Sequence, residues 1–409
     1  TLSITMPQDV LVEDYETNYL TTLLEDEFGV DIEFMLLPAD GGDAKSKFAV
    51  MASSNTELTD IVFNVNFTTL EIADYGSKGI FIPLNDYLTD AGKMPYFNEI
   101  PAEDKDSILV NSTSPDGNIY YMSKFSPVDW NLTPYRLWLN EVWLDKLDLE
   151  VPETTDEFYE VLKAFKTQDP NGNGVADEIP LTGTTKGWGT NSVYAIMNAF
   201  TFYDASGNSN GGLALGDDGK TVVAPFVTEE WKAGVEYMAM LCEEGLLSPA
   251  LFTQDASQFT ATLSNDTQIV GATSSGGTGY WSGAHNNPNR QEMSIIPPLK
   301  GPDGIAYTPF TPYSPEPAYF ISKDCENVDF AIEFGDFFYR EDISITGRYG
   351  EEGVNWTQDP DITKDYEGIY EDALGVPCSL LILEDPWSEV QNQSWYDAGP
   401  RYQSLEDSY

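Results

Sequence analysis

The first 65 residues alternate between strand-like and helix-like segments, and this order constrains the fold more than any other feature of the chain. Apolar runs at 2–6, 31–37 and 60–65 are typical of strands, and the segments at 14–28 and 44–54 carry apolar residues at helical spacing. Strand, helix, strand, helix, strand in this order predicts a parallel sheet with helices packed on its faces. We therefore expect an α/β fold.

Ligands of such sheets bind beyond the carboxyl ends of the strands. Asn64 and Asn66 lie at the carboxyl end of the third predicted strand, so their amide groups are candidates for hydrogen bonds to a ligand. Ordinary loop capping by the same side chains explains their position equally well.

A second constraint is the run from Asp169 to Glu178, D-P-N-G-N-G-V-A-D-E, in which oxygen-bearing side chains alternate with glycines. It begins like an EF-hand loop, with Gly174 at the sixth position, where the chain must turn sharply. Pro180 stands at the twelfth position in place of the usual bidentate Glu, so we expect the acidic residues at positions nine and ten to replace it. A solvated turn is the alternative. The predicted Ca2+ ligands are Asp169, Asn171, Asn173, the carbonyl of Val175, Asp177 and Glu178.

The charge composition limits the kinds of molecule that the protein can bind. The chain has 409 residues, enough for two or three domains, and its 68 Asp and Glu against 20 Lys and Arg give a formal net charge of −48. Such a charge repels phosphate backbones and anionic lipid, so we expect neither nucleic acid nor a membrane surface as a partner. A hydrophobic fraction of 41% indicates a folded chain rather than a disordered acidic one.

Seven segments occur in one order along most of the chain, and their order makes the set far more specific than any single segment. They are Asp60-Ile-Val-Phe63, Tyr75–Tyr87, Trp143-Leu-Asp-Lys-Leu147, Val151–Phe158, Leu162–Phe165, the loop at 169–180, and Tyr349–Trp356. In this order they resemble the extracellular solute-binding proteins of sugar ABC transporters, family 1. The subgroup that they resemble comprises oligosaccharide-binding lipoproteins with an EF-hand-like calcium loop.

The resemblance implies an α/β, two-lobed periplasmic-binding-protein-like fold of class II, in which a hinge joins the lobes and the ligand cleft lies between them. By this analogy the N-terminal lobe comprises 1–125 and 315–375, and the C-terminal lobe comprises 126–314 and 376–409. The calcium loop would be structural and lie in the C-terminal lobe, away from the cleft. The protein would lie outside the cell, lipid-anchored to a Gram-positive surface or, alternatively, in a periplasm.

Sugar sites combine aromatic platforms, which cover the apolar C–H faces of the ring, with a few placed polar groups. Four of the nine tryptophans lie in loops or glycine-rich segments, and Asp129 adjoins one of them. Packing in a core is the competing explanation for each tryptophan. The predicted sugar-contacting residues are Asn64, Asn66, Asp129, Trp130, Trp188, Trp281 and Trp356.

The leading hypothesis is a monomeric, non-catalytic component of a carbohydrate ABC importer, which captures an oligosaccharide and delivers it to the membrane permease. We expect a neutral sugar, because only five arginines are available to pair with an acidic one. A glycoside hydrolase with paired carboxylates is one alternative, although 68 acidic residues make such a pair uninformative. A calcium-dependent adhesion module is another, although such modules usually repeat the loop.

Overall fold

The structure, a computed structural model, describes the chain apart from residues 55–56, 204–211, 217, 278, 282–286, 311, 365–379, 385–389, 405–406 and 409. The chain divides into two compact units. Unit 1 comprises Thr1–Val128, Tyr313–Tyr366 and Cys378–Ser408, and unit 2 is built on Asp129–Pro312. None of the helices in the described parts is long and apolar enough to cross a membrane.

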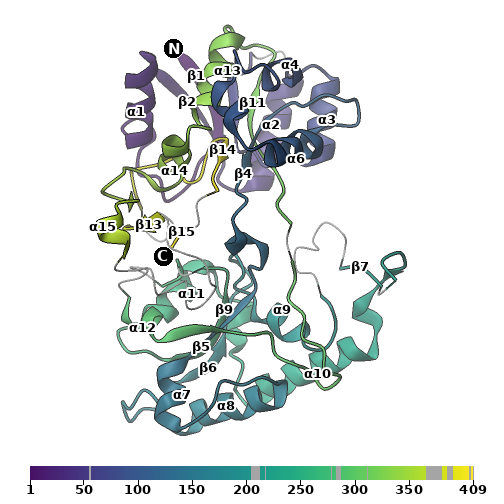
Figure 1. Ribbon diagram of the computed structural model, residues 1–409, viewed down its shortest axis with the longest axis vertical. Coiled ribbons are helices and arrows are strands. Elements are labelled where there is room, and N and C mark those ends of the chain that lie inside the picture. The colour runs from purple at the N-terminus through teal and green to yellow at the C-terminus, as the bar shows by residue number, and fades with distance from the viewer. Residues whose placement is uncertain are drawn as a thin grey trace. The chain divides into compact units, whose positions relative to one another are not determined.

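Unit 1 contains a six-stranded mixed sheet in the order β14-β4-β11-β3-β1-β2 (Figure 1). β1 (Leu2–Pro7) lies parallel to both β2 (Ile32–Leu37) and β3 (Ile61–Phe63), which confirms the predicted parallel pairing. β11 (Glu316–Ile321) runs antiparallel to β3 on one side and to β4 (Met122–Phe125) on the other.

The helices between the first strands begin at polar caps. α1 (Tyr19–Phe28) begins later than the predicted 14–28, because the Asn18 side chain accepts a hydrogen bond from the N–H of Leu20 and caps the helix there. Gly29, at φ 64°, ends the helix as predicted. α2 (Gly41–Ser53) is capped in the same way by Asp40.

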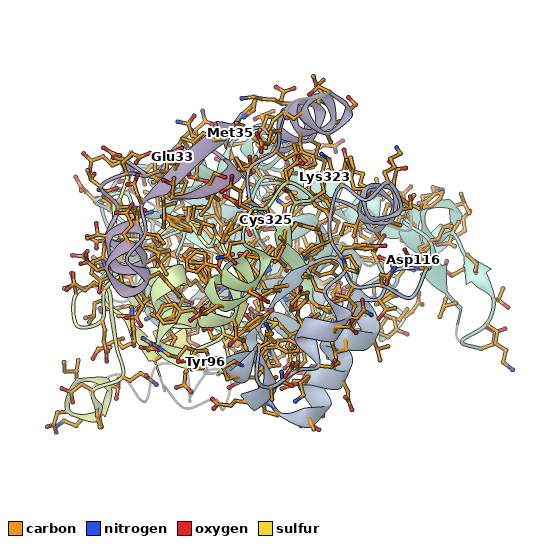
Figure 2. All side chains as sticks on the ribbon, turned by 90° about the horizontal axis from the view of Figure 1, so that it is seen from above. Glu33, Met35, Tyr96, Asp116, Lys323 and Cys325 are labelled. Atoms are coloured by element: carbon orange, nitrogen blue, oxygen red, sulfur yellow. The ribbon has the colours of Figure 1, made fainter. Side chains whose placement is uncertain are left out.

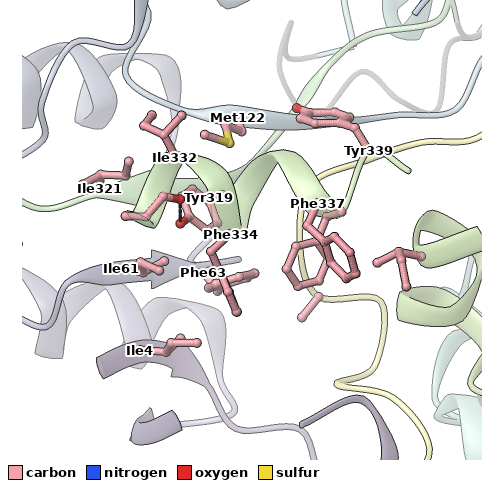
Figure 3. Close-up of a cluster of buried hydrophobic side chains, with 14 of the residues drawn as sticks. Ile4, Ile61, Phe63, Met122, Tyr319, Ile321, Ile332, Phe334, Phe337 and Tyr339 are labelled. Atoms are coloured by element: carbon pink, nitrogen blue, oxygen red, sulfur yellow. Dashed lines mark hydrogen bonds between the residues drawn. The ribbon is translucent and has the colours of Figure 1, made fainter. Parts of the chain in front are cut away.

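Alternate residues of the central strands face two separate cores, as the period of two requires. Ile4, Phe63 and Tyr319 pack toward α1 and α13 (Val328–Phe337), and Figure 3 shows this core. Val62 and Phe320 face α2 and α3 (Thr69–Ser77) on the other side. β2 closes the sheet as an edge strand, and its outer residues Glu33 and Met35 are exposed (Figure 2).

Unit 2 contains a four-stranded sheet in the order β10-β5-β9-β6. β9 (Val270–Ser275) lies parallel to β6 (Ile179–Thr182) and antiparallel to β5 (Arg136–Asn140), and β10 (Met293–Ile296) pairs with the other edge of β5. Because β6 and β9 are parallel, the loops that follow them leave the same edge of the sheet. α8 (Thr155–Thr167) covers this sheet, and the predicted capping box of Thr154 and Glu157 is confirmed.

The remaining elements are shorter or peripheral. In unit 1 the helices are α4 (Asn85–Leu88), α5 (Pro95–Glu99), α6 (Ala102–Ser112), α14 (Glu341–Tyr349) and α15 (Pro360–Thr363), and the strands are β12 (Trp356–Thr357), β13 (Leu380–Ile382) and β15 (Asp407–Ser408). In unit 2 they are α7 (Glu141–Leu147), α9 (Ser192–Met197), α10 (Glu229–Glu243), α11 (Ala256–Leu263), α12 (Pro288–Gln291), β7 (Ala214–Leu215) and β8 (Val222–Val223).

The C-terminal segment packs on unit 1, which corrects the assignment of 376–409 to the C-terminal lobe. Trp395 is buried, donates to Oγ1 of Thr21 at 2.8 Å, and packs edge-on against Phe34 with ring centroids 5.3 Å apart. β14 (Arg401–Tyr402) then joins the sheet parallel to β4. These partners are hundreds of positions apart in the sequence, so no local pattern predicts the contact.

Candidate functional site

The glycine-rich segment after β9 lies against the loop that follows β6. The N–H of Gly276 donates to the carbonyl of Trp188 at 3.1 Å, and the N–H of Trp188 donates to the hydroxyl of Tyr280 at 2.7 Å. These two hydrogen bonds fix the backbone at Trp188 between the two ends of the glycine-rich segment.

The indole of Trp188 packs directly over Gly276. A Cβ atom on Gly276 would lie 2.3 Å from Cε3 of Trp188, so only glycine allows this approach. Gly189 has φ 67°, and a Cβ there would meet the carbonyl of Pro134 at 2.1 Å. The Trp188 side chain nevertheless remains 45% exposed. An aromatic ring that is held in one orientation and still open to solvent is suited to stacking on the apolar face of a sugar.

A cavity of about 260 Å3 lies in the same unit, slightly below the roughly 300–1,000 Å3 usual for ligand pockets. Arg136 lines it, is buried, and donates from Nη1 to the carbonyl of Gly276 at 2.6 Å. The same side chain thus reaches both the cavity and the backbone beneath Trp188. Other residues of the cavity wall are Thr133, Tyr135, Ala195, Pro298 and Tyr307.

A larger cavity, of about 610 Å3, lies in unit 1. Its Arg340 forms two hydrogen bonds to Asp342, at 2.6 and 2.8 Å, and the hydroxyl of its Tyr402 donates to Asp104 at 2.6 Å. Because these polar groups already bind one another, this cavity is the weaker candidate for a ligand site.

Two predicted platforms are wrong. Trp281 is fully buried and packs against Trp138, with ring centroids 5.6 Å apart. Trp356 is 1% exposed, and its Nε1 donates to the carbonyl of Gly350 at 2.8 Å. Both follow or flank glycines, as an exposed indole would, but both are buried. In this structure neither ring has a free face for a sugar.

Asn64 and Asn66, which follow β3, differ in whether the fold already uses their side-chain amides in hydrogen bonds. Asn64 donates from Nδ2 to the carbonyl of Asp397 at 3.0 Å and accepts from the N–H of Gly399 at 3.3 Å, so both ends of its amide serve the fold. Asn66 is exposed at φ 51°, and the described residues offer its side chain no hydrogen bond. Asn66 therefore stays a candidate. The side chains of Asp129 and Trp130, which belong to a 3-10 turn at Asp129–Leu132, lie outside the described part.

The predicted calcium loop follows α8 and is closed by hydrogen bonds between its own residues. The N–H of Gly174 donates to Oδ2 of Asp169 at 3.1 Å, and the amides of Asn171 and Asn173 both donate to Asp177, each at 3.1 Å to Oδ1. Gly174 has φ 75°, which provides the turn that the sixth position requires.

The carboxylates of this loop are close enough to one another to disfavour their common ionisation. Oε1 of Glu178 is buried and has no hydrogen-bond partner among the described residues. Burial raises the pKa of Glu178, and the nearby carboxylates of Asp177 and Asp169 raise it further. Across the described parts of the chain, no group of His, Cys, Asp and Glu alone is arranged to hold a metal ion. A site here therefore requires the amide and carbonyl oxygens as well, as calcium loops do.

Several residues of the unit 2 site were missed by the sequence prediction. Tyr280, Tyr135 and Arg136 belong to the loops and strands around Trp188, and only the pairing of β5, β6 and β9 brings them together. The run Gly276-Gly277 was the one local signal, because paired glycines mark a place where other groups approach the backbone closely.

Comparisons with known proteins agree with this fold. The fructooligosaccharide ABC transporter substrate-binding protein FusA of Streptococcus pneumoniae is 28% identical over 340 residues, which cover 81% of this chain and 59% of FusA. The chain thus spans about three fifths of the length of this relative. The structure of FusA in complex with kestose matches with a TM-score of 0.78 at 24% identity, over 100% of this chain and 79% of FusA.

A structure of the FusA EF-hand mutant in complex with fructo-nystose matches with a TM-score of 0.77, also at 24% identity and with the same coverage. These matches confirm the two-lobed α/β solute-binding fold. The model of the bacterial extracellular solute-binding protein family matches residues 13–343, which is most of the chain. The protein therefore belongs to the bacterial extracellular solute-binding protein family.

Proposed function

We propose that the protein is the substrate-binding component of a carbohydrate ABC importer. It binds an oligosaccharide without cleaving it and delivers the sugar to a membrane permease. The observation that carries the proposal is the Trp188 indole, which is held over Gly276 and remains 45% exposed beside Arg136. Family membership and the similarity to FusA support it.

The proposed contacts divide by chemistry. Trp188 stacks on one sugar ring, and the tyrosines of the cavity wall supply further aromatic surface and hydroxyl groups. Asn66 supplies an exposed amide at the carboxyl end of β3. We propose a neutral rather than an acidic sugar, because Arg136 is the single cationic side chain among the described residues of the cavity wall, in a chain with only five arginines.

The test is a binding and turnover assay with a panel of neutral and acidic oligosaccharides. Titration calorimetry should give tight binding of at least one neutral sugar, and thin-layer chromatography should recover that sugar intact. Release of shorter sugars would overturn the proposal in favour of a glycoside hydrolase. Tighter binding of a uronate-containing sugar than of its neutral analogue would overturn the choice of a neutral ligand.

We propose that the loop at 169–178 holds one structural Ca2+. Its three carboxylates exceed the charge of the ion by one, which favours firm retention, and the buried oxygen of Glu178 would gain the partner that the described protein groups do not supply. Bound there, the ion would tie the end of α8 to the start of β6.

We also propose that the protein is a monomer and is held at the outer surface of the cell by a lipid anchor. The family's extracellular character supports the compartment. Mass spectrometry of the protein isolated from its own membrane fraction would test the anchor, and light scattering would test the oligomeric state.

A further inference from the structure

We infer that Asp397 is a positioning residue for sugar binding. It holds the loop after β3 together with the two chain crossings of unit 1, which are the segments where the chain leaves the unit near Val128 and re-enters it near Tyr313. The link to sugar rests on the proposed function. The structural part of the inference stands on the contacts of Asp397 alone.

Three cationic side chains gather on this one carboxylate. Lys124 Nζ lies 3.1 Å from Asp397 Oδ2, Arg348 Nε lies 3.7 Å from Oδ1, and Arg401 Nη1 also pairs with Oδ1. The side chains of Lys124 and Arg401 are 11% exposed, so their interactions with Asp397 are only weakly screened by salt. In a chain of net charge −48, such a concentration of positive charge is unusual.

The backbone around Asp397 is joined to the loop that carries Asn66. The carbonyl of Asp397 accepts from Asn64, and the N–H of Gly399 donates to the same Asn64 side chain. Tyr396 and Asp397 have φ of 53° and 60°, and Asn64 and Asn66 have φ of 46° and 51°. These four are among only six non-glycine residues with positive φ in the described chain. Strained backbone of this kind persists only where its surroundings hold it.

The same segment contacts the place where the chain leaves unit 1 and is linked through Phe125 to the place where the chain returns. The chain leaves after Val128, and just before that point Arg401 Nε donates to Oγ of Ser126 at 3.3 Å. Tyr402 stacks on Phe125, with ring centroids 6.5 Å apart and planes 12° apart. Phe125 in turn packs edge-on against Tyr313, where the chain re-enters the unit.

Asp397 therefore connects three features: a strained loop with an exposed amide, the outgoing crossing and the returning crossing. Hinge motions are absorbed by a few residues at the ends of elements. A group that fixes the loop after β3 also fixes the Asn66 amide that the proposed function assigns to the sugar. A purely structural ion pair would instead affect only the stability of the fold.

The experiment compares Asp397→Asn with Asp342→Asn. The control residue also pairs with an arginine in unit 1, Arg340, but it is exposed and far from Asp397 in sequence. Sugar affinity is measured by calorimetry well below the melting temperature of each variant. We expect Asp397→Asn to weaken binding about tenfold, as typical coupling between linked sites does, and the control to stay within about twofold.

Hydrogen exchange provides a second readout that needs no sugar. Amides of 64–67 and 125–128 should exchange faster in Asp397→Asn than in the wild type or in Asp342→Asn. If Asp397→Asn does not fold, Arg401→Gln replaces it, because Lys124 and Arg348 remain to pair with Asp397.

Unchanged affinity, or unchanged exchange in both segments, would overturn the positioning role. A wild-type protein that binds no sugar in the panel would instead overturn the proposed function, and the exchange experiment would still decide whether Asp397 holds the loop and the crossings.

Discussion

Trp188 packs its indole against the bare α-carbon of Gly276, so closely that a Cβ atom at position 276 would lie 2.3 Å from Cε3 of the ring. Gly276 directly follows β9, so the orientation of the ring is set by the sheet of unit 2. Trp188 remains 45% exposed despite this contact, so part of its aromatic surface is available to a ligand.

Gly276→Ala should weaken sugar binding. The added methyl group must displace the indole from its platform position, and we expect a loss of about tenfold in Kd, or roughly 1.4 kcal/mol. Calorimetry measures the affinity, and the tryptophan emission spectrum reports the changed environment of the ring. Gly41→Ala is the control, because a Cβ at Gly41 meets no atom within 4 Å. Equal affinities of Gly276→Ala and the wild type would contradict the platform.

Trp188→Ala and Trp281→Ala should have opposite profiles. Trp188 is half exposed, so its loss should remove sugar affinity and lower the free energy of unfolding by only about 1 kcal/mol. Trp281 is fully buried against Trp138, so its loss should cost about 3–5 kcal/mol of stability. Calorimetric Kd values and urea unfolding measure the two effects. Full sugar affinity in Trp188→Ala would assign the stacking role to another ring.

Removal of calcium should lower the melting temperature. An ion that binds only the folded state stabilises it by about 2.7 kcal/mol when its concentration is 100 times Kd. We expect a chelator to lower the melting temperature of the wild type and to leave that of Glu178→Gln nearly unchanged. Sugar affinity at low temperature should change little in either protein.

Magnesium is the control ion for this experiment, because it demands octahedral geometry and retains its water. Mg2+ added after the chelator should restore less of the melting temperature than Ca2+ does. A large loss of sugar affinity on chelation at low temperature would place the ion in the sugar site rather than in a structural loop.

The contribution of Asp336 to the free energy of unfolding should fall as the pH rises from about 4 to 6. It is 2% exposed, and burial raises its pKa to about 6, although the N–H groups of Phe97 and Tyr96 donate to it. The unfolded value is about 3.9, so between these values the folded state binds more protons than the unfolded state does. The free energy of unfolding should therefore fall by about 2–3 kcal/mol across this range.

Asp336→Asn should lack this contribution. The difference in unfolding free energy between wild type and variant, measured in urea at several pH values, isolates it from the other carboxylates. The difference should persist at about 1 M salt, because burial rather than surface charge causes it. Parallel pH profiles of the two proteins would show that Asp336 does not titrate in this range.

The local signals in the sequence were reliable wherever neighbouring residues decide the structure. Gly29 ends α1, and Thr154 and Glu157 form the predicted capping box, because these signals act within one turn of helix. The parallel pairing of β1, β2 and β3 followed from the order of strands and helices. The convergence of Asp169 and Gly174 also lies within one loop.

The exposure of the tryptophans was not predictable in this way. Trp188, Trp281 and Trp356 share glycine-rich surroundings, but only Trp188 is exposed. The difference depends on whether another segment, such as the chain near Trp138 or the carbonyl of Gly350, folds over the ring. For Asn64, a ligand contact and loop capping were equally good explanations, and its amide binds the segment at 397–399.

The sequence by itself determined the α/β order of elements, the sharp turn at Gly174 and the family, because each depends on residues close together or on a fixed order along the chain. Only the tertiary structure decided which indole stays open and where the C-terminal segment lies. The position of the C-terminal segment depends on contacts between residues hundreds of positions apart, such as Asp397 with Lys124 and Trp395 with Thr21. The exposure of the indoles depends on packing such as that of Trp188 on Gly276 and of Trp281 on Trp138, which the residues next to each tryptophan do not reveal.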